Sequence, residues 1–208
     1  MVGTIYRLGA GGFTAFAVAM QYWFLISGPG GADIGSTVRF FSFFTILTNV
    51  LAALALLAPV LAPRSALGQF LARPSVRTII AAYIILVGMV YYLLLRGLSH
   101  REGWPLFFEE LLHYVTPPLF VMDWLAFVPK RKLGASVGLA GIWFPVAYIA
   151  WTLVHGAVTG WYPYPFVDVA DLGYGQVLLN IAGLVLIYLA LAGLLAIAGR
   201  NIGFPRGE

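Results

Sequence analysis

Apolar residues along the chain are gathered into six long runs, which are separated by short polar or Gly/Pro-rich breaks. The runs cover residues 6–27, 36–61, 76–97, 104–128, 136–159 and 174–199. A helix that crosses the hydrocarbon core of a membrane needs roughly 20 predominantly apolar residues, and each run reaches that length. The pattern therefore predicts an all-α, polytopic membrane protein built as a compact bundle of six transmembrane helices.

The breaks between the runs leave no room for a soluble domain, since only 62–75 and 160–173 exceed about ten residues. Composition supports the same class, because 61% of the residues are hydrophobic and 10% are charged. The mean hydropathy of +0.91 is far above that of soluble proteins. Residues 1–208 are thus predicted to form a single integral membrane domain.

Basic residues are divided unequally between the two sides of the predicted bundle. Nine lie on one side, namely Arg7, Arg64, Arg73, Arg77, Lys130, Arg131, Lys132, Arg200 and Arg206, and three lie on the other, namely Arg39, Arg96 and Arg101. Cytoplasmic segments of membrane proteins carry an excess of Lys and Arg, so both termini are predicted to be cytoplasmic. No stripe of basic residues is interleaved with aromatic ones, which argues against a nucleic-acid partner.

The apolar run 36–61 contains three polar residues near its middle. They are Thr45, Thr48 and Asn49, in the stretch FFSFFTILTNVLAALALLAP. A threonine in a membrane helix commonly bonds to a carbonyl of its own helix or joins two helices. A cluster of three such residues also fits a binding or catalytic site, and both interpretations stay open at this point.

The run 104–128 is the most polar of the six, with Glu109, Glu110, His113 and Asp123. Ionisable groups inside a membrane are costly and are functional by default, so His113 is a candidate site residue. Asp123 lies further along, close to the basic segment 130–132, which predicts an interfacial salt bridge or a helix contact. Two prolines at 117–118 predict a kink one turn past His113.

Counting along the helices places Thr45 and His113 at the same depth. With the N-terminus inside, the runs 36–61 and 104–128 both start at the outer side, and each residue lies about 14 Å below that start at 1.5 Å per residue. A hydroxyl and an imidazole at one level can form the nucleophile and the general base of an acyl-transfer site if the two helices are neighbours. Thr45 and His113 are therefore the candidate catalytic residues.

Neighbouring polar residues have the spacing of supporting groups. Glu109 and Glu110 lie four and three residues before His113, so either carboxylate could fix the tautomer of the imidazole. The alternative for both is an ion pair with one of the arginines on the outer side. Asn49 lies one turn after Thr45, next to Thr48, and its amide could donate to a developing oxyanion.

Three ring-bearing residues are candidates for contacts with the substrate. They are Tyr114, beside His113, and Trp151 and His155 in the run 136–159. His155 is near the outer end of its helix and also fits a purely interfacial position. The loop that follows, GWYPYPFVDVADLG, is rich in Trp and Tyr, which is typical of an interfacial aromatic belt on the outer side.

Three motifs of this chain resemble a known family: FFTILTN at 43–49, LLHYVTPPLFVMDWL at 111–125 and WYPYPFVD at 161–168. The chain resembles the bacterial six-helix branch related to the androgen-induced gene 1 protein and the androgen-dependent TFPI-regulating protein. The resemblance implies a multipass hydrolase of fatty acid esters of hydroxy fatty acids in the bacterial inner membrane. It implies an intramembrane threonine nucleophile and a histidine partner, at Thr45 and His113. The Ala/Gly-rich helices, the KRK segment and the YPYPF loop depart from the animal proteins and leave the substrate open.

Two other functions stay open. A metal-dependent hydrolase would use His113, His155 and a carboxylate such as Glu109 or Asp123. However, the chain has no cysteine and none of its three histidines forms an HxxxH or HExxH pair, so neither a metal site nor a cofactor is predicted. A non-enzymatic binder or transporter would use the polar cluster as a recognition site or proton relay. In each case the expected partners are membrane lipids and a lipid-derived small molecule.

Overall fold

The computed structural model describes residues 1–28, 31, 33–98, 101–130, 133–134 and 136–202, and these contain helices and no strand. The α-helices are α1 (Val2–Ile26), α2 (Ile34–Phe41), α3 (Phe44–Leu61), α4 (Ala66–Ala72), α5 (Pro74–Val90), α6 (Gly103–Glu110), α7 (Thr116–Phe127), α8 (Val137–Ala140), α9 (Trp143–Thr159) and α10 (Val169–Asn201). Two π-helical turns, Tyr91–Leu95 and Leu111–Val115, and a 3₁₀ turn, Pro165–Val167, complete the set. The predicted all-α class is confirmed.

Four helices are long and apolar enough to cross a membrane: Val2–Ile26, Phe44–Leu61, Pro74–Leu95 and Val169–Asn201. The predicted count of six crossing helices is not confirmed, because the other two apolar runs fold in shorter pieces. The run 104–128 is divided into α6, a π-helical turn and α7. The run 136–159 is divided into α8 and α9, and α9 has 17 residues. Long apolar helices of this kind are compatible with a membrane protein.

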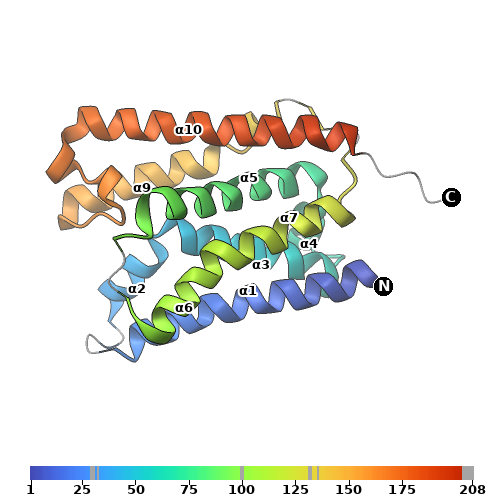
Figure 1. Cartoon of the computed structure of the whole chain (residues 1–208), viewed down its shortest axis with the longest axis horizontal. Coiled ribbons are helices and arrows are strands. Elements are labelled where there is room, and N and C mark those ends of the chain that lie inside the picture. The colour runs from blue at the N-terminus through green and yellow to red at the C-terminus, as the bar shows by residue number, and fades with distance from the viewer. Residues whose placement is uncertain (29–30, 32, 99–100, 131–132, 135, 203–208) are drawn as a thin grey trace.

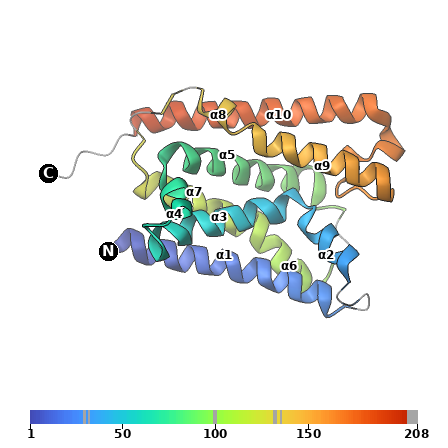
Figure 2. The same cartoon turned by 180° about the vertical axis from the view of Figure 1, so that it is seen from behind.

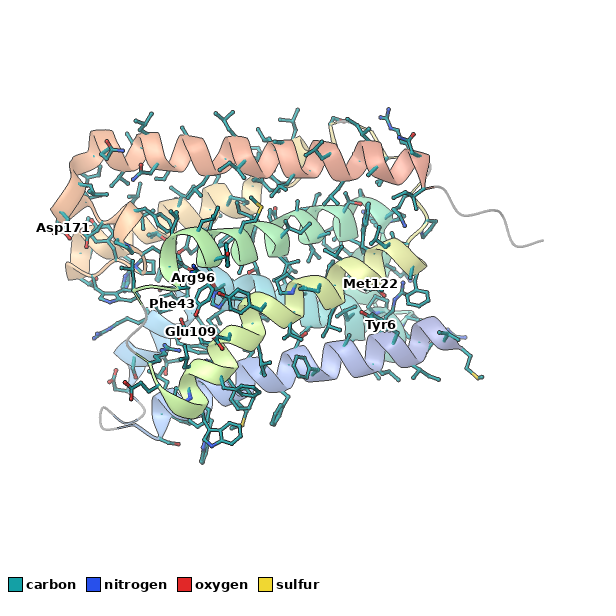
Figure 3. The ribbon with its side chains drawn as sticks, in the orientation of Figure 1. Tyr6, Phe43, Arg96, Glu109, Met122 and Asp171 are labelled. Carbon is teal, nitrogen blue, oxygen red and sulfur yellow. The ribbon has the colours of Figure 1, made fainter. Side chains whose placement is uncertain are left out.

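The helices form a bundle in which α10 runs along one side and α1 along the opposite side (Figures 1 and 2). Between them lie α3, α5 and α7, and α9 lies beside α10. We call the end at which α1 begins and α10 ends the terminal end, and the opposite end, which holds α2 and α6, the distal end. Figure 3 shows Phe43 and Glu109 toward the distal end, and Tyr6 and Met122 toward the terminal end.

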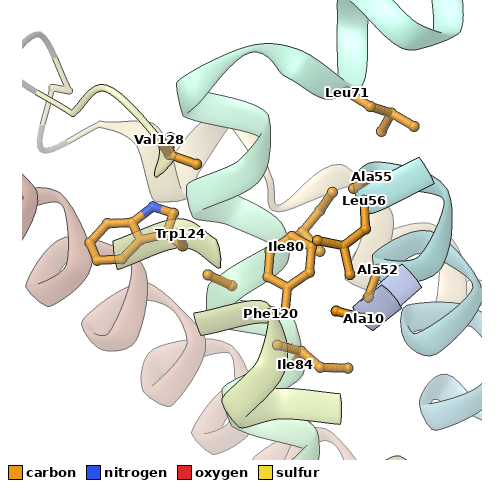
Figure 4. Close-up of a cluster of buried hydrophobic side chains, with 11 residues drawn as sticks. Ala10, Ala52, Ala55, Leu56, Leu71, Ile80, Ile84, Phe120, Trp124 and Val128 are labelled. Carbon is orange, nitrogen blue, oxygen red and sulfur yellow. The ribbon is translucent and has the colours of Figure 1, made fainter. Parts of the chain in front are cut away.

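The largest apolar core lies where α1, α3, α5 and α7 meet (Figure 4). Small residues of α1 and α3 face the large side chains of Phe120 and Trp124 on α7, and all of these are buried. A Cβ atom on Gly11 would lie 2.7 Å from Leu57 Cγ, so α1 and α3 approach each other closely at this glycine. Small residues at helix contacts permit such close packing in membrane proteins.

Asp123 of α7 is fully buried and lies between two arginines from other helices. Arg7 Nε of α1 lies 2.7 Å from Asp123 Oδ1, and Arg77 of α5 forms a short ion pair with Asp123 Oδ2. Arg77 Nη1 also donates to the Ala55 carbonyl of α3 at 2.6 Å. This group, which we call the ion triad, joins four helices of the bundle.

The ion triad confirms the helix contact predicted for Asp123 and corrects the alternative of an interfacial salt bridge beside 130–132. The carboxylate is buried and paired with two arginines of other helices that are distant in sequence. Lys130 Nζ donates to the carbonyls of Trp124, Leu125 and Val128, at the end of α7 and just after it. Arg131 and Lys132 lie outside the described residues. Sequence proximity misled here because a buried carboxylate pairs with cations that packing brings to it.

Candidate active site

The predicted second helix is interrupted between α2 and α3, and the interruption places Thr45 in the first turn of α3. Phe43 has an extended backbone, with φ −83° and ψ 126°. Side chains bond to the backbone groups beside the break: the Tyr148 hydroxyl donates to the Ser42 carbonyl at 3.1 Å, and the Thr45 N–H donates to the Tyr164 hydroxyl at 3.2 Å. Buried backbone groups require such partners, so the surrounding aromatic residues stabilise the break.

Thr45 and His113 are in direct contact inside the protein. Thr45 Oγ1 lies 3.2 Å from His113 Nε2, and both residues are buried. On the other side of the imidazole ring, His113 Nδ1 lies 2.7 Å from the Glu109 carbonyl oxygen. Because a carbonyl only accepts hydrogen bonds, Nδ1 carries the proton, and in a neutral ring Nε2 then accepts from the Thr45 hydroxyl. The predicted convergence of the two side chains is confirmed; their catalytic roles stay a prediction.

His113 lies in the π-helical turn Leu111–Val115 and stacks on Tyr91, which begins the other π-helical turn. The two ring centroids are 3.8 Å apart and the rings are inclined by 15°. Single π-helical turns within α-helices often occur at functional sites. The N–H of Thr116 bonds to the Leu111 carbonyl, five residues back, and the prolines that follow have no N–H to donate. A π-helical turn thus contains His113 and ends just before the two prolines, and the kink predicted one turn past His113 stays a prediction.

Tyr164 is the third residue at this point, and it was not among the predicted site residues. Its hydroxyl oxygen lies 3.3 Å from Thr45 Oγ1, and its ring stacks on Phe166 with centroids 5.2 Å apart. Burial raises the pKa of Tyr164 above its ordinary value, so the hydroxyl keeps its proton and can donate. The signal in the sequence was a tyrosine between two prolines, Pro163 and Pro165, whose rings restrict the backbone on both sides of it.

Asn49 and Thr48 do not face the site. Asn49 Nδ2 donates to the Thr45 carbonyl at 2.8 Å, and Thr48 Oγ1 donates to the Phe44 carbonyl at 2.8 Å. Both side chains bond back into α3 because helical side chains tilt toward the N-terminus of their helix. The predicted oxyanion role of the Asn49 amide is therefore wrong, and the common structural interpretation holds for Thr48.

The carboxylates of Glu109 and Glu110 do not orient His113. The Glu109 backbone carbonyl takes that position, and the Glu109 carboxylate forms an ion pair with Arg101 Nε at 3.4 Å. Glu110 is exposed. The predicted role of a carboxylate as the partner of the imidazole is wrong, and the alternative of an ion pair is confirmed for Glu109 with Arg101.

The three residues predicted to contact the substrate make contacts with other side chains around the site. The Tyr114 ring meets the Tyr91 ring edge-on, with centroids 5.4 Å apart. Trp151 Nε1 donates to Ser42 Oγ at 3.0 Å, and His155 stacks on Trp151. None of the three lines the cavities at Thr45. Their role in substrate binding stays a prediction, and Trp151 bonds to Ser42 beside the break before α3.

Two cavities meet at Thr45. The polar cavity has a volume of about 350 Å³, and its wall includes His113, Tyr91 and three polar side chains, those of Gln21, Arg101 and Glu109. Arg101 Nη1 donates to Gln21 Oε1 at 2.6 Å within this wall. The apolar cavity has a volume of about 80 Å³ and lies among α5, α9 and α10. Thr45, Leu95 and Tyr164 line both cavities.

The ligand set of the alternative metal site is not brought together. His113 contacts Thr45 and Tyr91, whereas His155 contacts Trp151 and Trp161. Asp123 belongs to the ion triad. In the part of the chain that the structure describes, no group of three or more His, Asp or Glu side chains could hold a metal ion.

No protein-family model, curated protein sequence or solved structure matches this chain. The resemblance to the androgen-induced gene 1 family stays a prediction from the motifs. The observations that bear on function are therefore the contacts of Thr45, His113 and Tyr164 and the two cavities that meet there.

Proposed function

We propose that the protein is an intramembrane hydrolase of lipid-like carboxylic esters, such as fatty acid esters of hydroxy fatty acids. Thr45 is the nucleophile and His113 is the general base. The observation that carries the proposal is the 3.2 Å contact between Thr45 Oγ1 and an imidazole whose other nitrogen is fixed by a backbone carbonyl. This is the arrangement of a nucleophile, a base and an orienting group that acyl transfer requires.

The reaction proceeds in two halves. Thr45 Oγ1 attacks the ester carbonyl carbon while His113 Nε2 takes the hydroxyl proton, and a tetrahedral oxyanion forms. Its collapse breaks the bond to the alcohol oxygen, to which His113 returns the proton, and leaves the acyl group on Thr45. Water then attacks the acyl-enzyme with His113 as base, which releases the acid and restores the threonine.

The oxyanion needs hydrogen-bond donors next to Thr45, and two are at hand. The Thr45 N–H belongs to the first turn of α3, where the helix dipole is positive, and it donates to the Tyr164 hydroxyl at 3.2 Å. An oxyanion placed between these two groups would accept from both of them. The Tyr164 hydroxyl lies within 3.3 Å of both the nitrogen and the Oγ1 of Thr45. We assign these two groups to the oxyanion in place of the Asn49 amide.

Labelling with a fluorophosphonate probe, which reacts with activated hydroxyl nucleophiles, tests the proposal. The purified protein should be labelled, and Thr45→Ala should lower the labelling rate on the order of 10³-fold or more. Thr45→Ser should keep part of it, because the hydroxyl remains. Thr48→Ala is the matched control and should be labelled like wild type, since the Thr48 hydroxyl bonds within its own helix. Undiminished labelling of Thr45→Ala would refute the nucleophile.

We also propose that six segments cross a bacterial inner membrane with both termini in the cytoplasm. The four long apolar helices support a membrane location, and the distribution of basic residues supports the orientation. A single cysteine is a unique probe because the chain has none. Asp171→Cys should react with an impermeant maleimide added to intact cells, and Arg64→Cys should react only after permeabilisation. The reverse pattern would overturn the orientation.

A further inference from the structure

His113 distinguishes the two cavities that meet at the nucleophile. Thr45 and Tyr164 line both of them, whereas His113 lines the polar cavity and is absent from the wall of the apolar one. The Thr45 Oγ1 atom thus has an imidazole on one side and a space enclosed by hydrocarbon and aromatic rings on the other. An ester bound at Thr45 would extend into both spaces.

The chemistry of the leaving group determines which cavity holds the alcohol portion of the ester and which holds the acyl chain. During collapse of the tetrahedral intermediate, the alcohol oxygen receives a proton from His113 Nε2, so it must lie within hydrogen-bond reach of that atom. The alcohol portion therefore lies in the polar cavity. The acyl chain is the other substituent of the carbonyl carbon and diverges from the alcohol oxygen. The apolar cavity is the second space that Thr45 and Tyr164 line, so we place the acyl chain there.

The side chains that line the two cavities agree with this assignment of the acyl chain and the alcohol portion. The apolar cavity is bounded by aliphatic side chains of α5 and α10, among them Leu86, Val87, Leu184 and Val185, and by Ile149 of α9. Such a wall favours hydrocarbon and provides little that could bind a polar head group. The polar cavity is wider and contains Arg101 and Glu109, so it can admit the water that cleaves the acyl-enzyme at the His113 side.

We propose that the apolar cavity among α5, α9 and α10 is the acyl-chain site, that its small volume of about 80 Å³ favours unbranched over branched hydrocarbon chains, and that the alcohol portion and the hydrolytic water use the polar cavity. This inference rests on the proposed hydrolase function. It makes the α10 residues Leu184 and Val185 specificity-determining, although neither touches the catalytic pair. These two side chains of α10 then determine which lengths and branching patterns of the acyl chain the cavity accepts.

Two series of water-soluble esters test the assignment with detergent-purified protein. In the first, the alcohol is p-nitrophenol and the acyl chain grows from acetyl to octanoyl; in the second, the acyl group is acetyl and the alcohol grows from ethanol to octanol. For wild type, kcat/KM in the first series should rise about fourfold per methylene until the cavity is full. Val185→Phe should abolish this rise and leave the second series unchanged. Leu186→Phe is the matched control, since Leu186 is 67% exposed, and it should behave like wild type in both series.

A second variant covers the case in which Val185→Phe does not fold. Leu184→Ala widens the cavity and should raise kcat/KM for the branched 2-ethylhexanoyl ester relative to the octanoyl ester at least about tenfold, because the missing side chain leaves room for the branch. An effect of either variant on the alcohol series instead of the acyl series would overturn the assignment, and so would the absence of any effect in folded protein. These outcomes are separate from failure of the hydrolase itself, which would appear as hydrolysis that survives Thr45→Ala.

Discussion

Thr45→Ala, His113→Ala and the double variant should all lower kcat for ester hydrolysis to a similar residual rate, on the order of 10³-fold to 10⁶-fold below wild type. The losses should not add, because the hydroxyl is activated only by the imidazole that it contacts, and the imidazole has no proton to take when the hydroxyl is gone. Initial rates with p-nitrophenyl butyrate, at saturating substrate, measure the effect. Additive losses would mean that the two side chains act independently.

Tyr164→Phe should lower kcat in the same assay by less than Thr45→Ala or His113→Ala does. It keeps the ring that stacks on Phe166 and removes the hydroxyl next to Thr45, so kcat should fall about 10²-fold to 10³-fold with little change in KM, as for other losses of an oxyanion donor. Tyr114→Phe is the control, since the Tyr114 ring only meets the Tyr91 ring edge-on, and it should retain wild-type kcat. A rise in KM alone for Tyr164→Phe would assign Tyr164 to substrate binding instead.

The helical class could be predicted from the sequence because long apolar runs are typical of helices and can be recognised without knowledge of their neighbours, although the runs 104–128 and 136–159 fold in shorter pieces. The pairing of Thr45 with His113 followed from depth alone, and it survived a break in the first of the two helices. That break consists of Ser42 and Phe43, three and two residues before Thr45. It could not be predicted, because the bonds from Tyr148 and Tyr164 to its backbone come from residues more than 100 positions away.

The groups that bond to Thr45 and His113 could be predicted less well than the pair itself, and the reason is the same for Asn49 and Glu109. Spacing along a helix shows which residues share a face, but it does not show whether a polar side chain turns back to its own backbone. Asn49 does so, and the Glu109 carbonyl rather than the Glu109 carboxylate meets His113. The π-helical turn changes the spacing around His113 as well, so a count based on regular turns misplaces the groups beside it.

The ion triad leads to the largest expected effect on stability. Asp123→Ala should lower the free energy of unfolding by about 3–5 kcal/mol, because it leaves the buried Arg77 guanidinium without its carboxylate. Arg77 is 1% exposed and cannot turn to water without disrupting the contacts among α1, α3, α5 and α7. Unfolding of the purified protein in mixed micelles of increasing SDS content measures the change. Glu110→Ala, at an exposed acid, is the control and should change it by less than about 0.5 kcal/mol.

A third variant separates the cost of an unpaired charge from the loss of packing. Asp123→Leu combined with Arg77→Met replaces the two fully buried charges of the triad by apolar side chains of similar volume, and it leaves Arg7, whose side chain is 21% exposed, in contact with the surroundings. The double variant should therefore recover much of the stability that Asp123→Ala loses. Figure 3 shows Tyr6 and Met122, the sequence neighbours of Arg7 and Asp123, toward the terminal end, whereas Glu109, whose carbonyl contacts His113, lies toward the distal end. The folded fraction of each variant should therefore keep wild-type kcat. If Asp123→Ala were as stable as Glu110→Ala, the carboxylate would not be neutralising Arg77, and the role of the triad in joining the four helices would be refuted.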